Sequence, residues 1–413
     1  MSTAQASNAI RPGVVVAATL DSKSEQISFL RDALNALGIA TIIVDCGVLG
    51  ETGLTPTISR AEVAAAAGAE IEVLRTRRDR ALAIATMVLG LQEVMRDLLR
   101  RNLVLGYLGV GGGTNAALAA AAFQVMPFGL PKVLLSTNAS GQTRPIVGTK
   151  DVVLINSVVD VLGLNPFLRD MLGRSAVIMA GQLRNPPAEN LSPREKCSVA
   201  ITTFGCTTQA AEIASELLNA AGHEVLGFHA RGTGGEAAEV FLREGRAGAI
   251  LDLTTTEIAD EVVGGVGSAG PTRLTTAGAL GIPQLVLPGA LDVINFGPPE
   301  TVPAKFAGRT LLAHTPIATL MRSSPEENVG IAEVMAERLN RAQGPVAVLL
   351  PMQGFSAYDH EGAPFHDPIA DTAFCDALTR RLDSHIMVEV IDAHINDFRT
   401  MDRAVAMLLG MLG

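Results

Sequence analysis

The sequence predicts an α/β protein built from two Rossmann-like parallel-sheet domains that are related by internal duplication, with a cleft between them. Two stretches that start 184 residues apart, at Val14 and Ser198, follow the same plan. Each has an apolar strand, a polar loop, an amphipathic helix closed by glycine and a second apolar strand, and at this offset Gly38 falls on Gly222. A repeated strand–helix–strand order is typical of parallel α/β folds.

Composition and two further blocks support this fold class. Hydrophobic residues make up 48% of the chain, but only 4% are aromatic and Trp is absent. The cores must therefore be built from Ala, Val, Leu and Ile, as in parallel sheets covered by helices. Residues 106–120 parallel residues 248–262, and residues 129–140 parallel residues 281–292. Three blocks in the same order make chance similarity a poor explanation.

Apolar runs and helical spacing predict the elements in chain order. In the first domain, residues 1–190, we expect strands at 13–20, 39–44, 103–110 and 133–136, and helices at 23–37, 60–67, 79–101 and 115–125. The segment 185–196, NPPAENLSPREK, has linker composition and sets the domain boundary. The second domain, residues 191–413, restarts at Cys197 and ends with strands at 346–350 and 386–391 and a helix from about Asp397 that could pack back on the first domain.

Charge and targeting signals limit the cellular role. A net charge of −10 argues against nucleic acid and anionic membrane surfaces as partners. The charge-free run from Asn102 to Pro131 could span a bilayer by length, but its Gly, Asn and Pro residues indicate a strand, a loop and a helix instead. The N-terminus lacks a secretory signal, and the four cysteines lack paired spacing, so we expect a cytoplasmic protein with reduced thiols.

In an open parallel sheet, ligands bind beyond the carboxyl ends of the strands, so the polar loops that follow the predicted strands are the candidate sites. GVGGGT (109–114) has the clearest meaning, because successive glycines let N–H groups turn toward one point and the next helix N-terminus favours an anion. Alternatively, GVGGGT forms a tight strand-to-helix turn that binds no ligand. It matches neither a Walker A loop nor the dinucleotide fingerprint, which disfavours a nicotinamide cofactor. The predicted phosphate and nucleotide contacts are Asp21, Lys23, Gly111, Gly112, Gly113, Thr114, Ser136, Thr137, Ser140, Gly141 and Arg144.

The second domain offers a second set of loops. His229 ends a predicted strand, where an imidazole could act as general acid or base. Asp252 and Glu257 flank three threonines and could act with it, or hold Mg²⁺ or a polar substrate; the alternatives are a hydrogen-bonded histidine and an N-cap environment. The predicted substrate contacts are Thr207, Thr208, Gly232, Thr233, Gly234, Gly235, Thr254, Thr255, Thr256 and Asn295.

Other polar groups are less specific. GFSAY (354–358) is one glycine short of a nucleophile elbow, and no Ser/His/Asp set can be assembled around it. Asp359, His360, His366 and Asp367 match no familiar metal-ligand spacing. We therefore predict no protein-bound metal site from them.

Seven motifs together make the chain recognisable. In chain order they are TLDSKSEQ, GVGGGT, PKVLLSTNASGQTRPIVGT, FHARGTGG, DLTTTEIADEVVGG, PGALDVINFGPPETVP and TLMRSSPEEN. They resemble the Tm-one-like ATP-binding domain family of bacterial and fungal proteins, a domain that also forms the N-terminal part of a plant inhibitor of tobamovirus replication. The resemblance extends from about Pro12 to Asn396, with Ser24 where the family usually has glycine.

The resemblance implies two Rossmann-like subdomains that bind ATP or a related nucleotide, with Mg²⁺ as a further candidate, and a homodimer or higher homo-oligomer. Our first hypothesis is therefore a nucleotide-binding protein without assigned activity, with phosphate held by GVGGGT in the interdomain cleft. A second is an ATP- or metal-dependent ligase or hydrolase that acts on a small carboxylate or phosphorylated metabolite through His229 with Asp252 or Glu257. A third is a ligand-regulated scaffold without turnover. The sequence leaves open whether the protein is an enzyme.

Overall fold

A computed structural model describes residues 10–141, 143–185 and 197–413. The chain divides into two compact units, Met1–Asn190 and Leu191–Gly413. Most of the predicted linker, residues 186–196, lies outside the described residues. None of the helices in the described ranges is both long and apolar enough to cross a bilayer.

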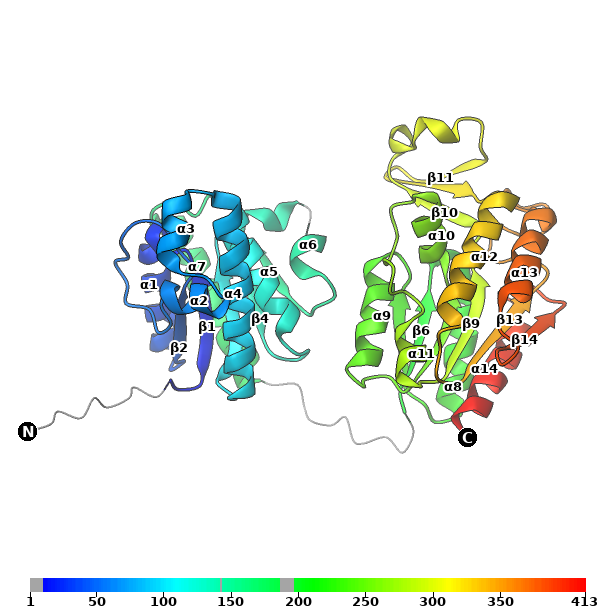
Figure 1. Cartoon of the computed structure of the whole chain (residues 1–413), viewed down its shortest axis with the longest axis horizontal. Coiled ribbons are helices and arrows are strands. Elements are labelled where there is room, and N and C mark those ends of the chain that lie inside the picture. Colours follow the sequence, from blue (N-terminus) through cyan, green and yellow to red (C-terminus); the bar gives the residue numbers. More distant parts are fainter. Residues whose placement is uncertain (1–9, 142, 186–196) are drawn as a thin grey trace, which may run out of the picture. The chain divides into compact units, whose positions relative to one another are not determined.

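The first unit is built on a five-stranded parallel sheet with the order β2-β1-β3-β4-β5 (Figure 1). Its strands are β1 (Gly13–Ala18), β2 (Thr41–Asp45), β3 (Val104–Val110), β4 (Lys132–Ser136) and β5 (Val153–Asn156). Its helices are α1 (Leu20–Ala36), α2 (Arg60–Ala66), α3 (Ile71–Arg77), α4 (Arg80–Arg100), α5 (Gly113–Val125), α6 (Arg144–Val147) and α7 (Pro166–Arg184), with a 3-10 turn η1 at Thr137–Ser140.

Helices on both faces of this sheet explain why β1 is apolar throughout. Successive side chains of a strand point to opposite faces. Val15 packs into a core with Met87 of α4, whereas Val14 packs into a separate core with Leu172 of α7. Every residue of β1 is buried, so no position of the strand can be polar.

The second unit contains a six-stranded parallel sheet with the order β14-β13-β9-β8-β6-β7. Its strands are β6 (Val199–Thr203), β7 (Val225–His229), β8 (Ala249–Thr254), β9 (Gln284–Gly289), β13 (Val346–Pro351) and β14 (Met387–Ile391). Its helices are α8 (Thr208–Ala220), α9 (Thr233–Arg243), α10 (Thr256–Val263), α11 (Thr276–Leu280), α12 (Pro325–Leu339), α13 (Pro368–Arg381) and α14 (Phe398–Leu412). The two parallel sheets confirm the predicted Rossmann-like fold class.

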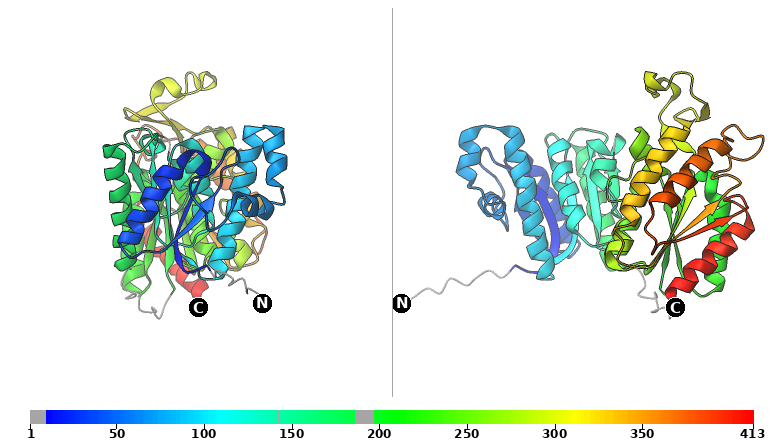
Figure 2. Two further views of the ribbon diagram at one scale, coloured as in Figure 1. Left: turned by 90° about the vertical axis from the view of Figure 1, so that its left-hand side faces the viewer. Right: turned by 45° about the vertical axis from the view of Figure 1, so that its right-hand side comes forward.

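Helices cover both faces of the second sheet as well. Leu285 of β9 shares a core with Leu408 of α14, and the next residue, Val286, shares another with Phe374 of α13. Figure 2 shows α14 in red on one side of this sheet and α13 in orange on the other. The apolar face of α14 is thus buried within its own unit. The contact with the first domain that we considered from the sequence is not needed to bury this helix.

A three-stranded antiparallel sheet, which the sequence did not predict, is inserted after β9. Its strands are β10 (Val293–Phe296), β11 (Leu311–Thr315) and β12 (Ala318–Arg322), in the order β10-β12-β11. We call residues 293–322 the arm, and Figure 1 shows it in yellow, projecting from the second unit. We expected 288–297 to be a strand-end loop, but its second half is β10. A helix, α3, likewise forms where we expected an irregular connection.

Both sheets share one topological feature that positions a site. The first strand of each unit lies between the second and the third, with β1 between β2 and β3 and β6 between β7 and β8. The chain therefore leaves the first strand in one direction and later returns on its other side. In open α/β sheets, ligands bind at the carboxyl ends of the strands at this switch point.

Close packing of α2 on α4 gives a test of the first unit. A Cβ added at Gly90 in α4 would lie 2.0 Å from the carbonyl oxygen of Val63 in α2. Although alanine is the better helix former, we expect Gly90→Ala to lower the free energy of unfolding by about 1–3 kcal/mol, because the helices must separate. The measurement is urea denaturation followed by circular dichroism.

The matched control is Gly173→Ala in α7, where an added Cβ meets no atom within 4 Å. There we expect a gain of about 0.5–1 kcal/mol. A Gly90→Ala protein as stable as the unmodified chain would contradict the packing of α2 on α4.

Candidate functional site

A cavity of about 580 Å³ lies at the carboxyl edge of the first sheet. Its polar lining residues are Thr19, Asp21, Ser22, Arg78, Asp79, Arg80 and Thr114. Its apolar lining residues are Cys46, Val48, Leu49, Leu74, Ala83, Ile84, Met87 and Leu118. The volume falls in the range of small-molecule sites, and an apolar wall beside a few polar groups is typical of them.

Two helices begin beside this cavity. α1 follows Thr19 and α5 follows Gly112, and neither of these residues caps its helix with a side chain. Helix N-termini carry unsatisfied N–H groups and partial positive charge, so an anion is favoured there. Asn115 links the two helices, because its buried Oδ1 accepts a hydrogen bond of 3.2 Å from the Thr19 amide.

Gly111 is required where it stands in the GVGGGT loop. Its φ of 139° is a conformation that other residues rarely adopt, and an added Cβ would lie 2.5 Å from Nδ2 of Asn115. Gly112 and Gly113 have ordinary φ, and an added Cβ would meet only Thr137 Oγ1, at 3.5 Å, or nothing. The loop therefore needs one glycine for its backbone and keeps the other two open toward the helix N-terminus.

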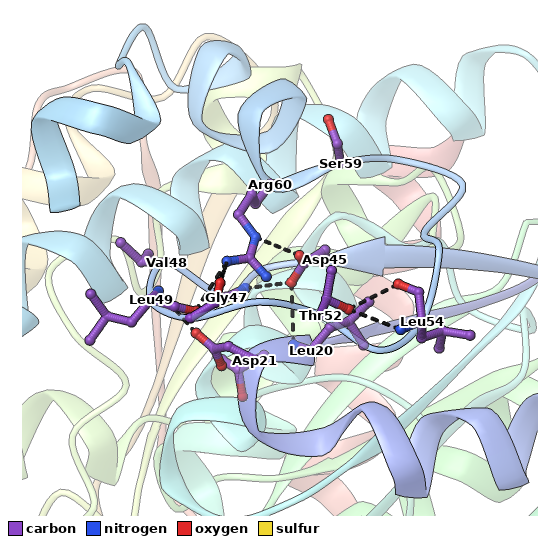
Figure 3. A network of polar contacts seen from close by, with 12 residues as sticks. Leu20, Asp21, Asp45, Gly47, Val48, Leu49, Thr52, Leu54, Ser59 and Arg60 are labelled. Atoms are coloured by element: carbon purple, nitrogen blue, oxygen red, sulfur yellow. Dashed lines mark hydrogen bonds and ion pairs between the residues drawn. The ribbon is translucent and has the colours of Figure 1, made fainter.

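A buried ion pair holds the loop that forms the apolar wall (Figure 3). Asp45, at the end of β2, accepts hydrogen bonds from the amides of Leu20 at 3.2 Å and Gly47 at 2.8 Å through Oδ1. Its Oδ2 accepts from Nε of Arg60 at 2.6 Å. Arg60 also donates to the carbonyl oxygens of Leu49 and Gly50, at 3.1 and 3.0 Å. The pair thereby fixes residues 46–50 against the start of α1.

Asp21 lies on the cavity side of the same network. Its Oδ2 accepts a hydrogen bond of 3.0 Å from the Leu49 amide, and its carboxylate packs over Gly47. A Cβ on Gly47 would lie 2.8 Å from this carboxylate, so the close approach depends on glycine. Asp21 is thus held at the cavity by the loop that Asp45 and Arg60 position.

The cations of the cavity come from the turn between α3 and α4. Arg78 adopts a left-handed conformation with φ of 52°, Asp79 accepts from the Leu82 amide as the N-cap of α4, and Arg80 begins that helix. Arg78 and Arg80 both line the cavity and are exposed. Within the described ranges, neither guanidinium has an ion-pair partner. Both are therefore available to an anionic ligand.

The structure brings together part of the predicted nucleotide set. Asp21 and Thr114 line the cavity, next to Gly111–Gly113. Lys23 does not line it, because its Nζ donates to the Val161 carbonyl at 2.7 Å. The remaining predicted contacts follow β4: Ser136 is buried and accepts from the Asn138 amide, Ser140 donates to the Thr137 carbonyl, Gly141 ends η1 and Arg144 begins α6.

In the second unit, the glycine-rich loop already has an acceptor within the chain. Oε1 of Glu257 accepts from the amides of Gly232 at 2.6 Å and Gly235 at 3.1 Å. Oε2 accepts from Nε of the fully buried Arg273 at 2.7 Å. A carboxylate of the chain therefore lies where the predicted ligand anion would bind. Burial, partly offset by Arg273, raises the pKa of Glu257.

Arg273 also holds the second predicted carboxylate. Its guanidinium forms a two-point contact with Asp252, which also accepts from Thr202 at 2.8 Å. Both acids are fully buried, and their contacts give them a structural role in holding Arg273. Their catalytic role stays a prediction. Sequence reasoning missed Arg273, although a buried pair of acids calls for a cation nearby.

The predicted substrate residues of the second unit are mostly buried and bonded within it. Thr207 and Thr254 share a hydrogen bond of 2.7 Å between their hydroxyls, Thr255 donates to the Leu287 carbonyl and Thr256 to the Val293 carbonyl. Asn295 donates to Asp260, whose pKa burial raises to about 7. Thr208 donates to the Phe204 carbonyl, Thr233 begins α9, and a Cβ on Gly234 would lie 1.8 Å from the His229 carbonyl oxygen.

His229 lies apart from these carboxylates. Its exposed ring stacks on Phe204 with centroids 5.3 Å apart, and burial together with Arg231 lowers its pKa. No hydrogen bond or ion pair in the described ranges joins His229 to Asp252 or Glu257. In the part of the chain that the structure describes, no group of three or more His, Cys, Asp or Glu side chains is placed to hold a metal ion.

Fold and cavity together define a two-unit Rossmann-like α/β protein with a cavity at the carboxyl edge of its first sheet. The chain belongs to the uncharacterised protein family UPF0261: residues 12–188 match its N-terminal domain and residues 196–412 its C-terminal domain.

Similar proteins come from bacteria and plants. A UPF0261 protein of Clostridium tetani is 41% identical over 93% of this chain and 95% of its own length. The ToMV resistance protein Tm-1(GCR237) of Solanum lycopersicum is 35% identical over 96% of this chain and 55% of its own length. A UDP-N-acetylglucosamine 2-epimerase structure from Rickettsia bellii covers 98% of this chain and 96% of its own at 12% identity, with a TM-score of 0.24. This score is too low to indicate a shared fold.

The Asp45–Arg60 pair should be essential to the cavity wall. Asp45→Asn removes the charge but keeps the shape, and it leaves Arg60 without its counterion in a buried position. We expect the free energy of unfolding to fall by about 3–5 kcal/mol, measured by urea denaturation. Hydrogen exchange of residues 46–50 should become faster.

The control is Glu93→Gln, which breaks the exposed pair between Glu93 and Arg96 on α4. That change should stay within about 0.5 kcal/mol of the unmodified protein. Equal stability of the Asp45→Asn and Glu93→Gln proteins would show that the buried pair does not hold the wall.

Proposed function

We propose that the first unit binds a nucleotide, ATP or a related one, in the cavity beside the GVGGGT loop. The observation that carries the proposal is the meeting of an apolar wall, two helix N-termini without side-chain caps and two unpaired arginines around one cavity. An apolar wall suits a base, and the N-termini with Arg78 and Arg80 suit phosphates. A base alone would not need the helix N-termini and the arginines, and a phosphate alone would not need the apolar wall.

Within this proposal, each part of the cavity has a role. The base lies against the α4 side chains Ala83, Ile84 and Met87, and the phosphates lie toward Thr114. Asp21 and Asp79 are the carboxylates that line the cavity, and Asp21 has one oxygen left after its bond to Leu49. Asp21 is therefore the residue that would face Mg²⁺ carried by the nucleotide, where the ion would offset phosphate charge.

We infer further that the two units are copies of one ancestral domain and that only the first kept an open anion site. The aligned sequences and the shared placement of the first strand support this inference. The internal acceptor Glu257 supports a closed site in the second unit. Turnover is not part of the proposal, because within the described part of the chain no hydrogen bond or ion pair joins His229 to Asp252 or Glu257. The interdomain cleft and the homodimer stay predictions.

Gly112→Val tests the phosphate loop. The added side chain would approach only Thr137 Oγ1 and would cover the N-terminus of α5 while leaving the backbone unstrained. We expect ATP affinity, measured by calorimetric titration, to fall at least about tenfold, or ~1.4 kcal/mol. Unmodified protein should bind one ATP per chain.

Gly205→Val in the second unit is the control, since an added Cβ there also meets nothing within 4 Å. It should leave ATP affinity unchanged. Unchanged affinity in a folded Gly112→Val protein would remove the GVGGGT loop from the site.

Arg80→Ala tests the cations. We expect ATP affinity to fall by about tenfold at low salt and by less at high salt, because exposed charges are screened. Arg77→Ala removes the same charge from the end of α3 but not from the cavity lining, and it should change the affinity little. Equal effects of the two substitutions would mean that only net charge matters.

A further inference from the structure

The base of the arm is held by one buried arginine. Arg322 is the last residue of β12 and is almost fully buried. Its guanidinium donates to the carbonyl oxygens of Phe365 at 2.7 Å and Asp367 at 3.2 Å, and to Oδ1 of Asp371 at 2.6 Å. Asp371 lies in the first turn of α13. A single side chain therefore ties the arm to the segment that leads into α13.

Three buried carboxylates surround this single cation. Asp371 contacts it directly, Asp359 lies 4.0 Å from it, and Asp292 is coupled electrostatically to both Arg322 and Asp359. Asp292 accepts from Ser356 Oγ at 2.6 Å, and Asp359 accepts from the Phe355 amide at 3.1 Å. Asp292 and Asp359 are both fully buried, and Oδ1 of each has no hydrogen-bond partner within the described ranges.

The three acids cannot all be ionised, because one guanidinium would leave two buried negative charges uncompensated. Protonation of two of the carboxyl groups is the simplest way to remove these two charges. In agreement, burial and Asp359 raise the pKa of Asp292 to about 7, and burial together with Asp359 and Asp292 raises that of Asp371 to about 8, although Arg322 opposes both shifts.

Other titratable groups face this cluster from the neighbouring elements. They are Cys206 and Tyr358 near Asp292, His366 and His394 near Asp359, and Cys375 near Asp371. His366 Nδ1 lies 4.0 Å from Asp359 Oδ1, so a protonated His366 would add a second positive charge.

We propose that protons shared by Asp292 and Asp371, beside the buried Asp359, latch the arm to the body of the second unit through Arg322, so that the arm loosens as the pH rises through neutrality. The sign follows from linkage: these acids hold protons in the latched state that they lose when exposed. The latch is therefore strongest at acid pH. It weakens from pH 4 upward and reaches its full loss above about pH 8.

Release of the arm would uncover part of the second sheet's carboxyl edge. Val293 and Leu320 of the arm pack in one apolar cluster with Phe204, Cys206 and Phe365. Phe204 directly follows β6, the strand at the switch point of this unit. The latch thus controls access to the carboxyl edge of the second sheet.

Hydrogen exchange by mass spectrometry between pH 5.5 and 9, corrected for intrinsic exchange rates, tests the latch. Protection of residues 318–322 and 355–367 should fall at least about tenfold as the pH rises. Asp359→Asn keeps an acceptor for the Phe355 amide but removes a negative charge that raises the pKa of Asp292 and of Asp371, so the midpoint of release should move to lower pH by about one unit. Protection that is independent of pH, or an unmoved midpoint in this variant, would overturn the proposal.

Glu327→Gln provides the matched control. Glu327 of α12 pairs with Arg309 of the arm at 2.7 Å, and Arg309 lowers its pKa, so it is ionised across this range. Its loss should weaken protection equally at all pH values without moving the midpoint. Carbon NMR of the aspartate carboxyls in the unmodified protein needs no variant: titration of both Asp292 and Asp371 near pH 4 would overturn the latch.

Discussion

The structure depends on one constraint: parallel strands bring helix N-termini to the same edge of a sheet, and the amides there must find acceptors. In the first unit, Asp45 takes the Leu20 amide and the remaining N-terminal groups of α1 and α5 border a cavity. In the second unit, Glu257 takes the amides of the glycine-rich loop. One architecture thus places a cavity at the edge of the first sheet and an internal acceptor, Glu257, at the edge of the second.

Much of the fold could be predicted because strands buried on both faces are mostly apolar, as β1 is throughout. The arm could not, because its strands pair antiparallel with each other in an insertion after β9. VINF follows a Gly–Ala–Leu–Asp turn and resembles the end of a loop when its partners are unknown. α3 was missed because it is short and mostly exposed, so it has little apolar periodicity.

Part of the candidate site could also be predicted from the sequence. Thr114 and Asp21 follow strands and could be placed at the edge from chain order alone. Arg78 and Arg80 reach the cavity through the turn between α3 and α4, whose position no sequence spacing indicates. From its position in the sequence, Lys23 looked as close to the predicted site as Asp21. Its side chain instead donates to the Val161 carbonyl oxygen. Asp45 did give a signal, since a charged residue at the end of a buried strand requires a partner.

Two buried arginines each face three carboxylates, and the two clusters differ in the hydrogen-bond donors that reach the acids. Around Arg273, further donors reach each acid: Glu257 accepts from two loop amides, Glu239 from the amides of Leu274 and Thr276, and Asp252 from Thr202. Around Arg322, Asp292 and Asp359 each leave one oxygen without a donor. Hydrogen bonds to the charged form favour ionisation, and their absence favours a bound proton. The donors that reach each acid, rather than the count of charges, thus distinguish the cluster around Arg273 from the proposed latch around Arg322.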